Sequence, residues 1–219
     1  MSVIAQGYAL HRQIFSPDEI TALQHEADQL AQSEGTACVR HIRSKSPLLH
    51  SLSRSEQLLA LIPTDYRPAR SILFDKTPEE NWSVPWHQDL TIAVQEHCDV
   101  EGYHPWSEKD GHPHVQPPST VLQQMVTLRI HLDQTDHANG ALYVIPDSHQ
   151  HGKLHSSEVP KLSKEKSHCC ECQPGDVLAM SPLILHSSHR STNPSRRRII
   201  HFEYAHRDCL SPALHWLED

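Results

Sequence analysis

The sequence contains little glycine, few aromatic residues and no long hydrophobic run. Of its 219 residues, 7 are Gly and 5% are Phe, Trp or Tyr. No segment approaches the roughly 18 consecutive apolar residues of a membrane-spanning helix. The opening MSVIAQGYALHRQIF has no apolar centre of the kind found in secretory signals. We therefore expect no membrane partner and no targeting segment.

Cysteine is present without the spacing of a disulfide or zinc framework. The six cysteines do not form an even secretory pattern. HCCEC at 168–172 places three of them together, but one strand cannot wrap a single zinc ion, so we interpret this segment as strand packing. A reducing, cytoplasmic location is the corresponding expectation.

The charge balance argues against nucleic acid as a partner, and the histidine content favours a metal site. The formal net charge is -8, whereas a surface that follows a phosphate backbone is normally basic. Twenty histidines are scattered along the chain, and imidazole is the commonest metal ligand. The length and the ordinary composition, 37% hydrophobic and 21% charged, fit one domain over residues 1–219.

Helical patterns come first. A short strand is expected around Tyr8–Phe15. Ser16, Pro17 and Glu19 then form a capping box with proline at the first helical position. Apolar residues at helical spacing follow until Gly35, and a second helix is predicted within Leu48–Ile62, before Pro63. This helical part spans about residues 1–65.

From about residue 66 to residue 206 the pattern changes to short β-branched and apolar runs. The predicted strands are RSILF, VPWHQDLTIAV, MVTLRIHLD, GALYVIPD, SHCCECQ, GDVLAMS, LILHSS and RRRIIHFEYA. Helices followed by many strands favour a mainly β fold with flanking α-helices, built as a double-layered sandwich or jelly roll. Gln95–Ser119 is too long for a hairpin loop and is predicted to be a functional or mobile loop.

One set of residues has the character of a metal site. In a strand, His87 and Asp89 point to the same face and Gln88 to the other, and His186 in LILHSS offers a third ligand. Two histidines and one carboxylate on one face of an octahedral ion leave the opposite face open, which suits iron(II). An HxD pair alone also arises by chance on a solvent-exposed strand, so the interpretation as a metal site depends on the residues around it.

Basic residues near the third ligand could bind a dicarboxylic acid. Ser188 shares the face of His186, and Arg197, Ile199 and His201 share one face of the following strand, after a turn at Asn193-Pro194-Ser195. A guanidinium matches a carboxylate in a bidentate manner. Arg196 and Arg198 are interpreted as a solvated strand end, and His149, His189 and His201 as structural.

Other positions stay open on sequence grounds. Arg129 lies on the polar face of MVTLRIHLD and either lines a wet pocket or faces solvent. Lys76 could supply a second positive charge but is more easily explained as a surface lysine. A further group lies in or near the long loop and either lines a substrate pocket or packs within the loop: Trp82, Trp86, Tyr103, Trp106, His112 and His114.

The combination of motifs resembles the phytanoyl-CoA dioxygenase family. HQD is followed by NGALYVIPDSHQHG, then PGD, then LHSS with an Arg eleven residues beyond the His, and the SPDEITAL helix fits as well. Asp147 stands where this family's PGSH turn usually has Gly, which affects only the turn. The resemblance implies a double-stranded β-helix (cupin-like jelly-roll) core, iron(II), 2-oxoglutarate and dioxygen.

The resemblance also implies residue roles and a reaction. His87, Asp89 and His186 match the metal ligands, Arg197 matches the arginine that binds 2-oxoglutarate, and Ser188 matches the hydroxyl beside it. The implied enzyme is an oxidoreductase that hydroxylates a small-molecule substrate and releases succinate and CO2. A carboxylate at position 89 favours hydroxylation, because related halogenases leave that position to chloride. The alternatives are a metal-dependent hydrolase and a non-enzymatic, cupin-like metal- or ligand-binding module.

Overall fold

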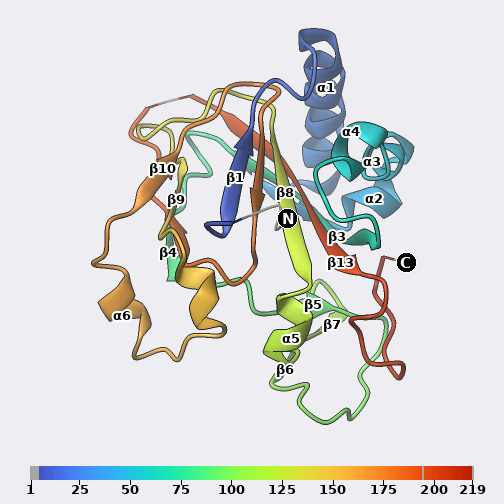
Figure 1. Ribbon diagram of the computed structural model, residues 1–219. Helices are drawn as coiled ribbons and strands as arrows, with labels where there is room; N and C mark the ends of the chain where they lie inside the picture. Colours follow the sequence, from blue (N-terminus) through green and yellow to red (C-terminus); the bar gives the residue numbers. More distant parts are fainter. Residues whose placement is uncertain (1–4, 194, 219) are drawn as a thin grey trace.

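The computed structural model describes residues 5–193 and 195–218 (Figure 1). Pro194, in the predicted turn before the last strand, lies outside the described residues. The predicted N-terminal strand is present as β1 (Tyr8–His11). Helices then gather on one side of a large sheet, and β3 (Tyr66–Lys76) begins the main series of strands.

Helix α1 (Pro17–Glu34) forms as its sequence predicts. Its capping box is complete, because the Ser16 side chain accepts from the backbone N–H of Glu19 while the Glu19 carboxylate accepts from the backbone N–H of Ser16. Gly35 ends the helix in the left-handed conformation, at φ 64°, which glycine adopts without steric cost. The expected apolar face, led by Ile20 and Leu23, is buried.

The predicted second helix is two short helices instead of one. α3 (Pro47–Leu52) and α4 (Glu56–Leu59) replace the single helix expected within Leu48–Ile62. The break lies at Ser53–Ser55, where the chain turns and Ser55 starts α4 in an extended conformation. Serine favours caps and turns because its side chain competes for backbone hydrogen bonds. The four-residue α2 (Ile42–Lys45) precedes them.

Two antiparallel sheets form the double-layered core that the sequence predicted. The larger has the order β1-β11-β8-β13-β3-β2 and the smaller has the order β10-β9-β12-β4. β1 and β2 lie before residue 66, so the N-terminal part also contributes both edges of the larger sheet. The remaining strands of the two sheets are β2 (Cys38–Arg40), β4 (Val84–His87), β8 (Met125–His131), β9 (Leu142–Val144), β10 (His168–Cys170), β11 (Val177–Met180), β12 (His186–Ser188) and β13 (Arg197–His206).

The segment Gln95–Ser119 contains a β-hairpin, so the predicted loop is wrong for this part of it. It contains β6 (Trp106–Lys109) and β7 (His112–Val115), which pair with each other and, through β7, with β5 (Ile92–Ala93) in a third sheet. Asp110-Gly111 forms the turn, with both residues at positive φ. An Asp-Gly pair between two strands is the usual signature of a tight hairpin. α5 (Ser119–Leu122) follows.

Side chains that alternate along the central strands give each strand an apolar face and a polar face. Val126, Leu128 and Ile130 of β8 lie in the main apolar cluster together with Phe202 and Tyr204 of β13, under helix α1. The opposite faces of these strands carry polar and charged side chains toward the second sheet. Burial of the apolar faces holds the helices to the sheet, and it leaves the polar faces to form a site between the layers.

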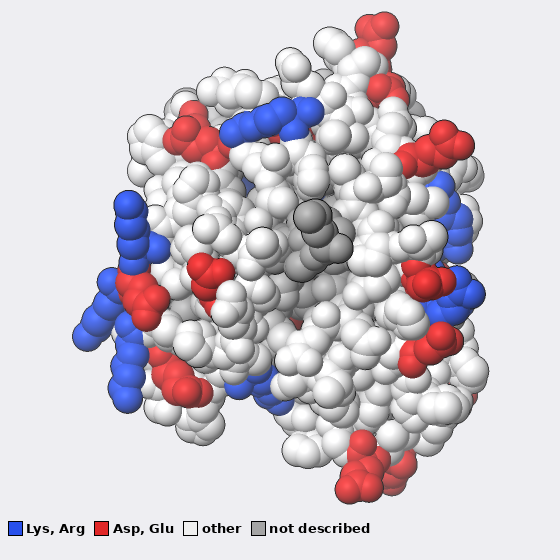
Figure 2. All heavy atoms as spheres, viewed as in Figure 1, with Lys and Arg blue, Asp and Glu red and all other residues white. Residues whose placement is uncertain are grey.

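The remaining connections run over the surface. η1 (Ser148–His151) and α6 (Val159–Leu162) lie between β9 and β10. Asp147, where the sequence lacked an expected glycine, adopts φ 66°, a left-handed conformation that aspartate tolerates better than most residues. Within the described ranges, no helix has the length and apolarity required to cross a membrane. Acidic and basic side chains are interspersed on the face drawn in Figure 2.

Candidate metal centre and adjoining pocket

Two histidines lie directly opposite each other in the smaller sheet. His87 is the last residue of β4 and His186 is the first of β12, and the two pair across the antiparallel ladder. Their ring centroids are 4.2 Å apart. Cross-strand neighbours point to the same face of a sheet, so strand pairing alone brings together two imidazoles that are 99 residues apart in the sequence.

Asp89 reaches the same point by a route that the sequence did not predict. The expected strand VPWHQDLTIAV ends at His87 and resumes only at β5. Asp89 lies in the connection, where its backbone N–H donates to the carbonyl of Pro182 at 2.9 Å. The Gln88 side chain points away, donating to the carbonyls of Gly152 and Leu183 and accepting from the N–H of Leu154. These contacts hold the connection in place of a strand ladder.

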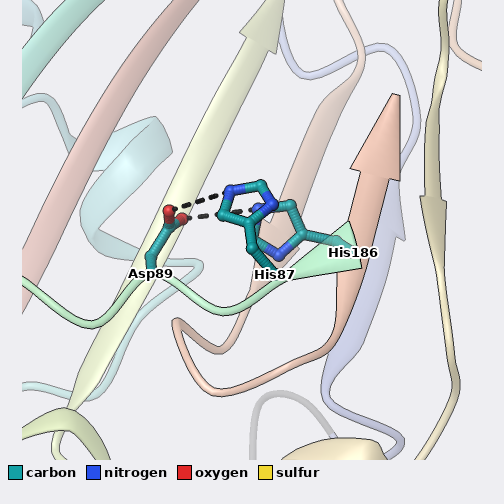
Figure 3. Close-up of side chains that lie close together, drawn as sticks. All are labelled: His87, Asp89 and His186. Atoms are coloured by element: carbon teal, nitrogen blue, oxygen red, sulfur yellow. Dashed lines mark ion pairs between the residues drawn. The ribbon is translucent and has the colours of Figure 1, made fainter. Parts of the chain in front are cut away.

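The three side chains form the one group within the described residues whose arrangement could hold a metal ion. The carboxylate of Asp89 faces both imidazoles (Figure 3), with its oxygens 3.6 Å from Nε2 of His87 and 3.7 Å from Nε2 of His186. Ligand atoms about 2.1 Å from one ion and at right angles to each other lie about 3 Å apart. The ligand atoms, which all lie within 4.8 Å of one another, would therefore move closer together around one cation.

Backbone carbonyls orient both histidines. Nδ1 of His87 donates to the carbonyl of Pro85 and Nδ1 of His186 donates to that of Ile184, each at 2.9 Å. Since a carbonyl only accepts, both Nδ1 atoms carry a hydrogen, so in the neutral form of each ring the lone pair is on Nε2, which faces Asp89. The Gln88 side chain hydrogen-bonds to Gly152, Leu183 and Leu154 and does not orient either ring.

The charges of the three groups depend on one another. Burial would lower the pKa of His87, but the Asp89 carboxylate and the Pro85 carbonyl raise it above its usual value. Burial lowers the pKa of His186 to about 4, against the opposing effect of Asp89. Burial would raise the pKa of Asp89, yet the two imidazoles hold it well below its usual range. A neutral His186 beside an ionised Asp89 is the protonation state that a cation requires.

Arg197 and Ser188 line the pocket beside this group. The pocket has a volume of about 180 Å³. Arg197 is 4% exposed, and its side chain forms no ion pair or hydrogen bond with any described residue, its buried Nε included. Burial, together with the charge of Arg129, lowers its pKa to about 9. A buried guanidinium without a counterion is costly unless a ligand supplies one.

Lys76 is not the surface lysine that the sequence favoured. It pairs with Arg197 across the β3–β13 ladder and is 1% exposed. Its Nζ donates to the carbonyl of His189 at 3.0 Å and lies 5.2 Å from the centre of the Trp82 ring. Burial lowers its pKa to about 8, with Arg197 and Arg129 adding to the effect. Three cationic side chains thus gather at this end of the pocket.

Arg196 and Arg198 are not a solvated strand end. Arg196 pairs with Asp75 at 2.5 Å and with Asp28 at 2.7 Å. Arg198 is buried and forms a two-pronged contact with Asp133, with 2.8 and 2.9 Å distances. Both arginines join helix α1 or strand β3 to the outer side of β13. The carboxylates that neutralise them come from distant segments, which local sequence cannot reveal.

Arg129 faces the pocket and begins a buried polar chain. Its Nη1 donates to Nδ1 of His201 at 3.1 Å. Because guanidinium only donates, Nδ1 accepts and Nε2–H of His201 donates to Glu203 at 3.2 Å. Arg70 donates to the same Glu203 oxygen at 3.1 Å. His201, which was interpreted as structural, therefore lines the pocket together with Glu203.

Most of the aromatic and histidine candidates near Gln95–Ser119 lie elsewhere. Trp82 lines the pocket. Trp86 packs on the cluster around Leu154, and Tyr103 and Trp106 belong to the core beneath the third sheet. His112 contacts the ring of His41, and His114 is buried. Cys170 and Cys172 are also buried, in agreement with their interpretation as packing residues.

Several pocket residues escaped prediction. Arg70, Ile72 and Phe74 alternate along β3 and face the pocket, as does Arg40 of β2. RSILF was recognised as a strand, and its alternation could have indicated one polar and one apolar side. However, β3 is buried on both faces, so alternation alone does not identify the functional side.

Comparison with known proteins agrees with this architecture. The family model for phytanoyl-CoA dioxygenase (PhyH) matches residues 4–199. A search of curated proteins found no match. Among solved structures, the non-heme alpha-ketoglutarate-dependent carbocyclase SnoK from nogalamycin biosynthesis has a TM-score of 0.70 at 19% identity, over 92% of this chain and 80% of that one.

Two further structures contain ligands. EctD from S. alaskensis, with 2-oxoglutarate and 5-hydroxyectoine, has a TM-score of 0.70 at 20% identity, over 92% of this chain and 72% of that one. HygX from Streptomyces hygroscopicus, with nickel and 2-oxoglutarate, has a TM-score of 0.68 at 15% identity, over 93% and 84%. At these identities the likeness establishes the jelly-roll fold. The family match over most of the sequence goes further: the chain belongs to the phytanoyl-CoA dioxygenase (PhyH) family.

Proposed function

We propose that this protein is an iron(II)- and 2-oxoglutarate-dependent dioxygenase that hydroxylates a small molecule and releases succinate and CO2. Family membership supports the reaction class, and the similar structures EctD and HygX contain 2-oxoglutarate. The observation that carries the proposal is the convergence of His87, Asp89 and His186 beside Arg197, a buried arginine without a carboxylate partner among the described residues.

The proposed ligand set is His87, Asp89 and His186. Two neutral imidazoles and a carboxylate on one face of the ion leave the other face to co-substrate and dioxygen. When bound, the iron supplies the oxidative chemistry, for which 2-oxoglutarate is the reductant. The carbonyls of Pro85 and Ile184 keep both Nε2 atoms available as ligands. Orientation by groups beyond the ligands is typically worth 10–100-fold in metal affinity or activity.

Arg197 is the proposed anchor for the distal carboxylate of 2-oxoglutarate, with Ser188 beside it. The guanidinium would regain by this contact the counterion that the protein itself does not provide. Arg129 and Lys76 add positive charge at the same end, since Arg129 lowers the pKa of Arg197 and both arginines lower the pKa of Lys76. A dianionic ligand therefore fits this end of the pocket better than a neutral one.

Hydroxylation of a small substrate fits the remaining features. The pocket volume of about 180 Å³ is below the roughly 300–1,000 Å³ of ligand pockets in general. Asp89 occupies the carboxylate position that a halogenase leaves free for chloride. A hydrolase would need an unpaired general base near the metal, whereas the nearby Glu203 already accepts from Arg70 and His201.

The decisive test is succinate formation that requires iron(II), 2-oxoglutarate and dioxygen together. Asp89→Ala should reduce it at least about 100-fold, because loss of even an orienting residue costs 10–100-fold. The matched control is Asp99→Ala. His97-Cys98-Asp99 has the same HxD spacing and a similar 3.7 Å contact, but Asp99 is fully exposed.

The outcomes separate the alternatives. Succinate formation by Asp99→Ala but not by Asp89→Ala supports the proposal. Full activity in Asp89→Ala would remove Asp89 from the ligand set. Metal binding without any turnover of 2-oxoglutarate by the wild type would favour a hydrolase or a binding module.

A further inference from the structure

A second group of basic side chains consists of Arg40 and Arg70, which line the pocket, and Lys109, which shares the contact of Arg70 with Thr91. Arg40 lies opposite Ile72 in the β2–β3 ladder, and Arg70 precedes Ile72 by two residues, so the two arginines are diagonal neighbours on one face. Lys109 ends β6 and donates to Oγ1 of Thr91 at 3.2 Å, while Arg70 donates to the carbonyl of Thr91 at 3.3 Å. We call Arg40, Arg70 and Lys109 the cationic mouth.

The mouth and the Arg197 end are separate binding positions. Along β13, Arg197 faces Lys76 and Glu203 faces Arg70. Six residues of strand between Arg197 and Glu203 correspond to about 20 Å between their Cα atoms, and the four residues between Arg197 and His201, which is level with Ile72 and Arg40, correspond to about 13 Å. The five-carbon chain of 2-oxoglutarate cannot span either length. An acid bound at Arg197 therefore leaves the cationic mouth available.

The negative charge around the cationic mouth does not balance it. Glu203 accepts from Arg70, but it also accepts from His201. Arg40 pairs at 2.8 Å with Asp110, whose side chain is 53% exposed at the hairpin turn. Lys109 forms no ion pair with any residue that the structure describes. The remaining nearby carboxylate, Asp89, belongs to the proposed metal site.

Unused hydrogen-bond donors accompany this excess of charge. The Nε atoms of Arg40 and Arg70 are both buried and have no acceptor among the described residues. Burial lowers the pKa of Lys109, and the charges of Arg70 and Arg40 lower it further, which indicates that the three cations lie within electrostatic range. Buried donors without partners are uncommon in folded proteins, and an oxyanion would satisfy them.

We propose that Arg40, Arg70 and Lys109 bind a carboxylate or phosphate group of the substrate. Asp110 forms an ion pair with Arg40 until this anion displaces the Asp110 carboxylate. This assignment of substrate class rests on the proposed function. A guanidinium fork matches the oxygens of either anion in a bidentate manner. Asp110, exposed at the hairpin tip, is the carboxylate that gives way most easily, because water solvates it on release.

Calorimetric titration of the full-length protein with inorganic phosphate, and separately with acetate, tests the proposal at constant ionic strength. The titration is repeated in Arg197→Met, which removes the other basic end, and binding should persist. Arg40→Gln should weaken the binding about tenfold or more, as expected for loss of a charge-assisted hydrogen bond. Asp110→Asn should strengthen it, because a competing carboxylate is lost while asparagine retains the left-handed turn conformation.

Opposite effects of two paired residues distinguish binding from structure. If the Arg40–Asp110 pair only stabilised the hairpin, both substitutions would weaken binding alike, and that result would overturn the proposal. So would the absence of saturable binding of either anion. Arg207→Gln is the matched control, since Arg207 pairs with an exposed Asp65 away from the pocket, and it should leave both affinities unchanged.

The two anions identify the source of the oxyanion. Tighter binding of phosphate supports a phosphorylated substrate, and tighter binding of acetate supports a carboxylic acid. The result is independent of turnover. Anion binding that responds to Arg40 and Asp110 in a protein that forms no succinate would keep this subsite and refute the proposed function.

Discussion

Replacing Arg197 with methionine should stabilise the protein without 2-oxoglutarate and remove most of its affinity for that co-substrate. Arg197 is 4% exposed and has no counterion among the described residues. Its neighbours across and along the sheet include two further cations, Lys76 and Arg129. Methionine keeps an unbranched apolar side chain in the space of the arginine stem and removes the charge.

The magnitude follows from the pKa. Burial and Arg129 lower the pKa of Arg197 from 12.5 to about 9. Since one pKa unit corresponds to about 1.4 kcal/mol, the buried charge opposes folding at neutral pH by at most about 5 kcal/mol. Replacement of buried charges by apolar side chains typically recovers 1–4 kcal/mol. For a chain of this size we expect the melting temperature to rise by about 3 °C or more.

The same substitution should lower the affinity for 2-oxoglutarate, whereas it raises the stability of the ligand-free protein. Loss of one partner of a buried charge pair typically costs 2–5 kcal/mol, or roughly 30- to 5,000-fold in affinity. Thermal unfolding with and without saturating 2-oxoglutarate, at a fixed metal concentration, measures both effects. Arg207→Gln serves again as the exposed control. A variant that is less stable than the wild type without ligand, or that binds 2-oxoglutarate normally, would refute the assignment of Arg197 as an anion anchor.

Two other predictions concern stability. The pKa of Lys76 is lowered from 10.5 to about 8 by burial and by its cationic neighbours. Below pH 8 the Lys76 amine is protonated in both the folded and the unfolded state. Between pH 8 and 10.5 it is protonated only in the unfolded state. The stability of the wild type should therefore rise relative to that of Lys76→Met across this window, by up to about 3 kcal/mol. Denaturant titrations at pH 7 and pH 10 measure the difference, and equal gaps at both would contradict it. Ser16→Ala removes the capping box of α1 and should lower stability by about 1 kcal/mol, whereas Ser33→Ala in the same helix should not; equal melting temperatures for wild type and Ser16→Ala would show that the box contributes nothing.

Features encoded locally could be predicted from the sequence. The capping box at Ser16, the αL end at Gly35 and the alternation of β8 each depend on residues within one element. The double-layered β architecture followed from the order of these elements. His87 and His186 converge because neighbouring strands pair them, which the sequence could suggest but not establish.

Features that depend on distant partners could not be predicted. Asp89 reaches the two histidines although its strand ends at His87, because Gln88 and Pro182 hold the connection. Lys76 is buried because β13 places Arg197 opposite it, and Arg198 is buried because Asp133 and Asp28 neutralise it. The burial of a charged side chain is decided by what the fold brings to it. A local sequence pattern therefore cannot predict which charged side chains are buried.

The most direct test of the metal centre is an anaerobic titration of the protein with iron(II) and 2-oxoglutarate, followed by absorption spectroscopy. We expect a visible charge-transfer absorption that saturates at one iron per chain, requires both components and is lost in His186→Ala. A spectrum unchanged by adding 2-oxoglutarate to the iron-loaded wild type, or a full signal in His186→Ala, would contradict a shared site formed by His87, Asp89, His186 and Arg197.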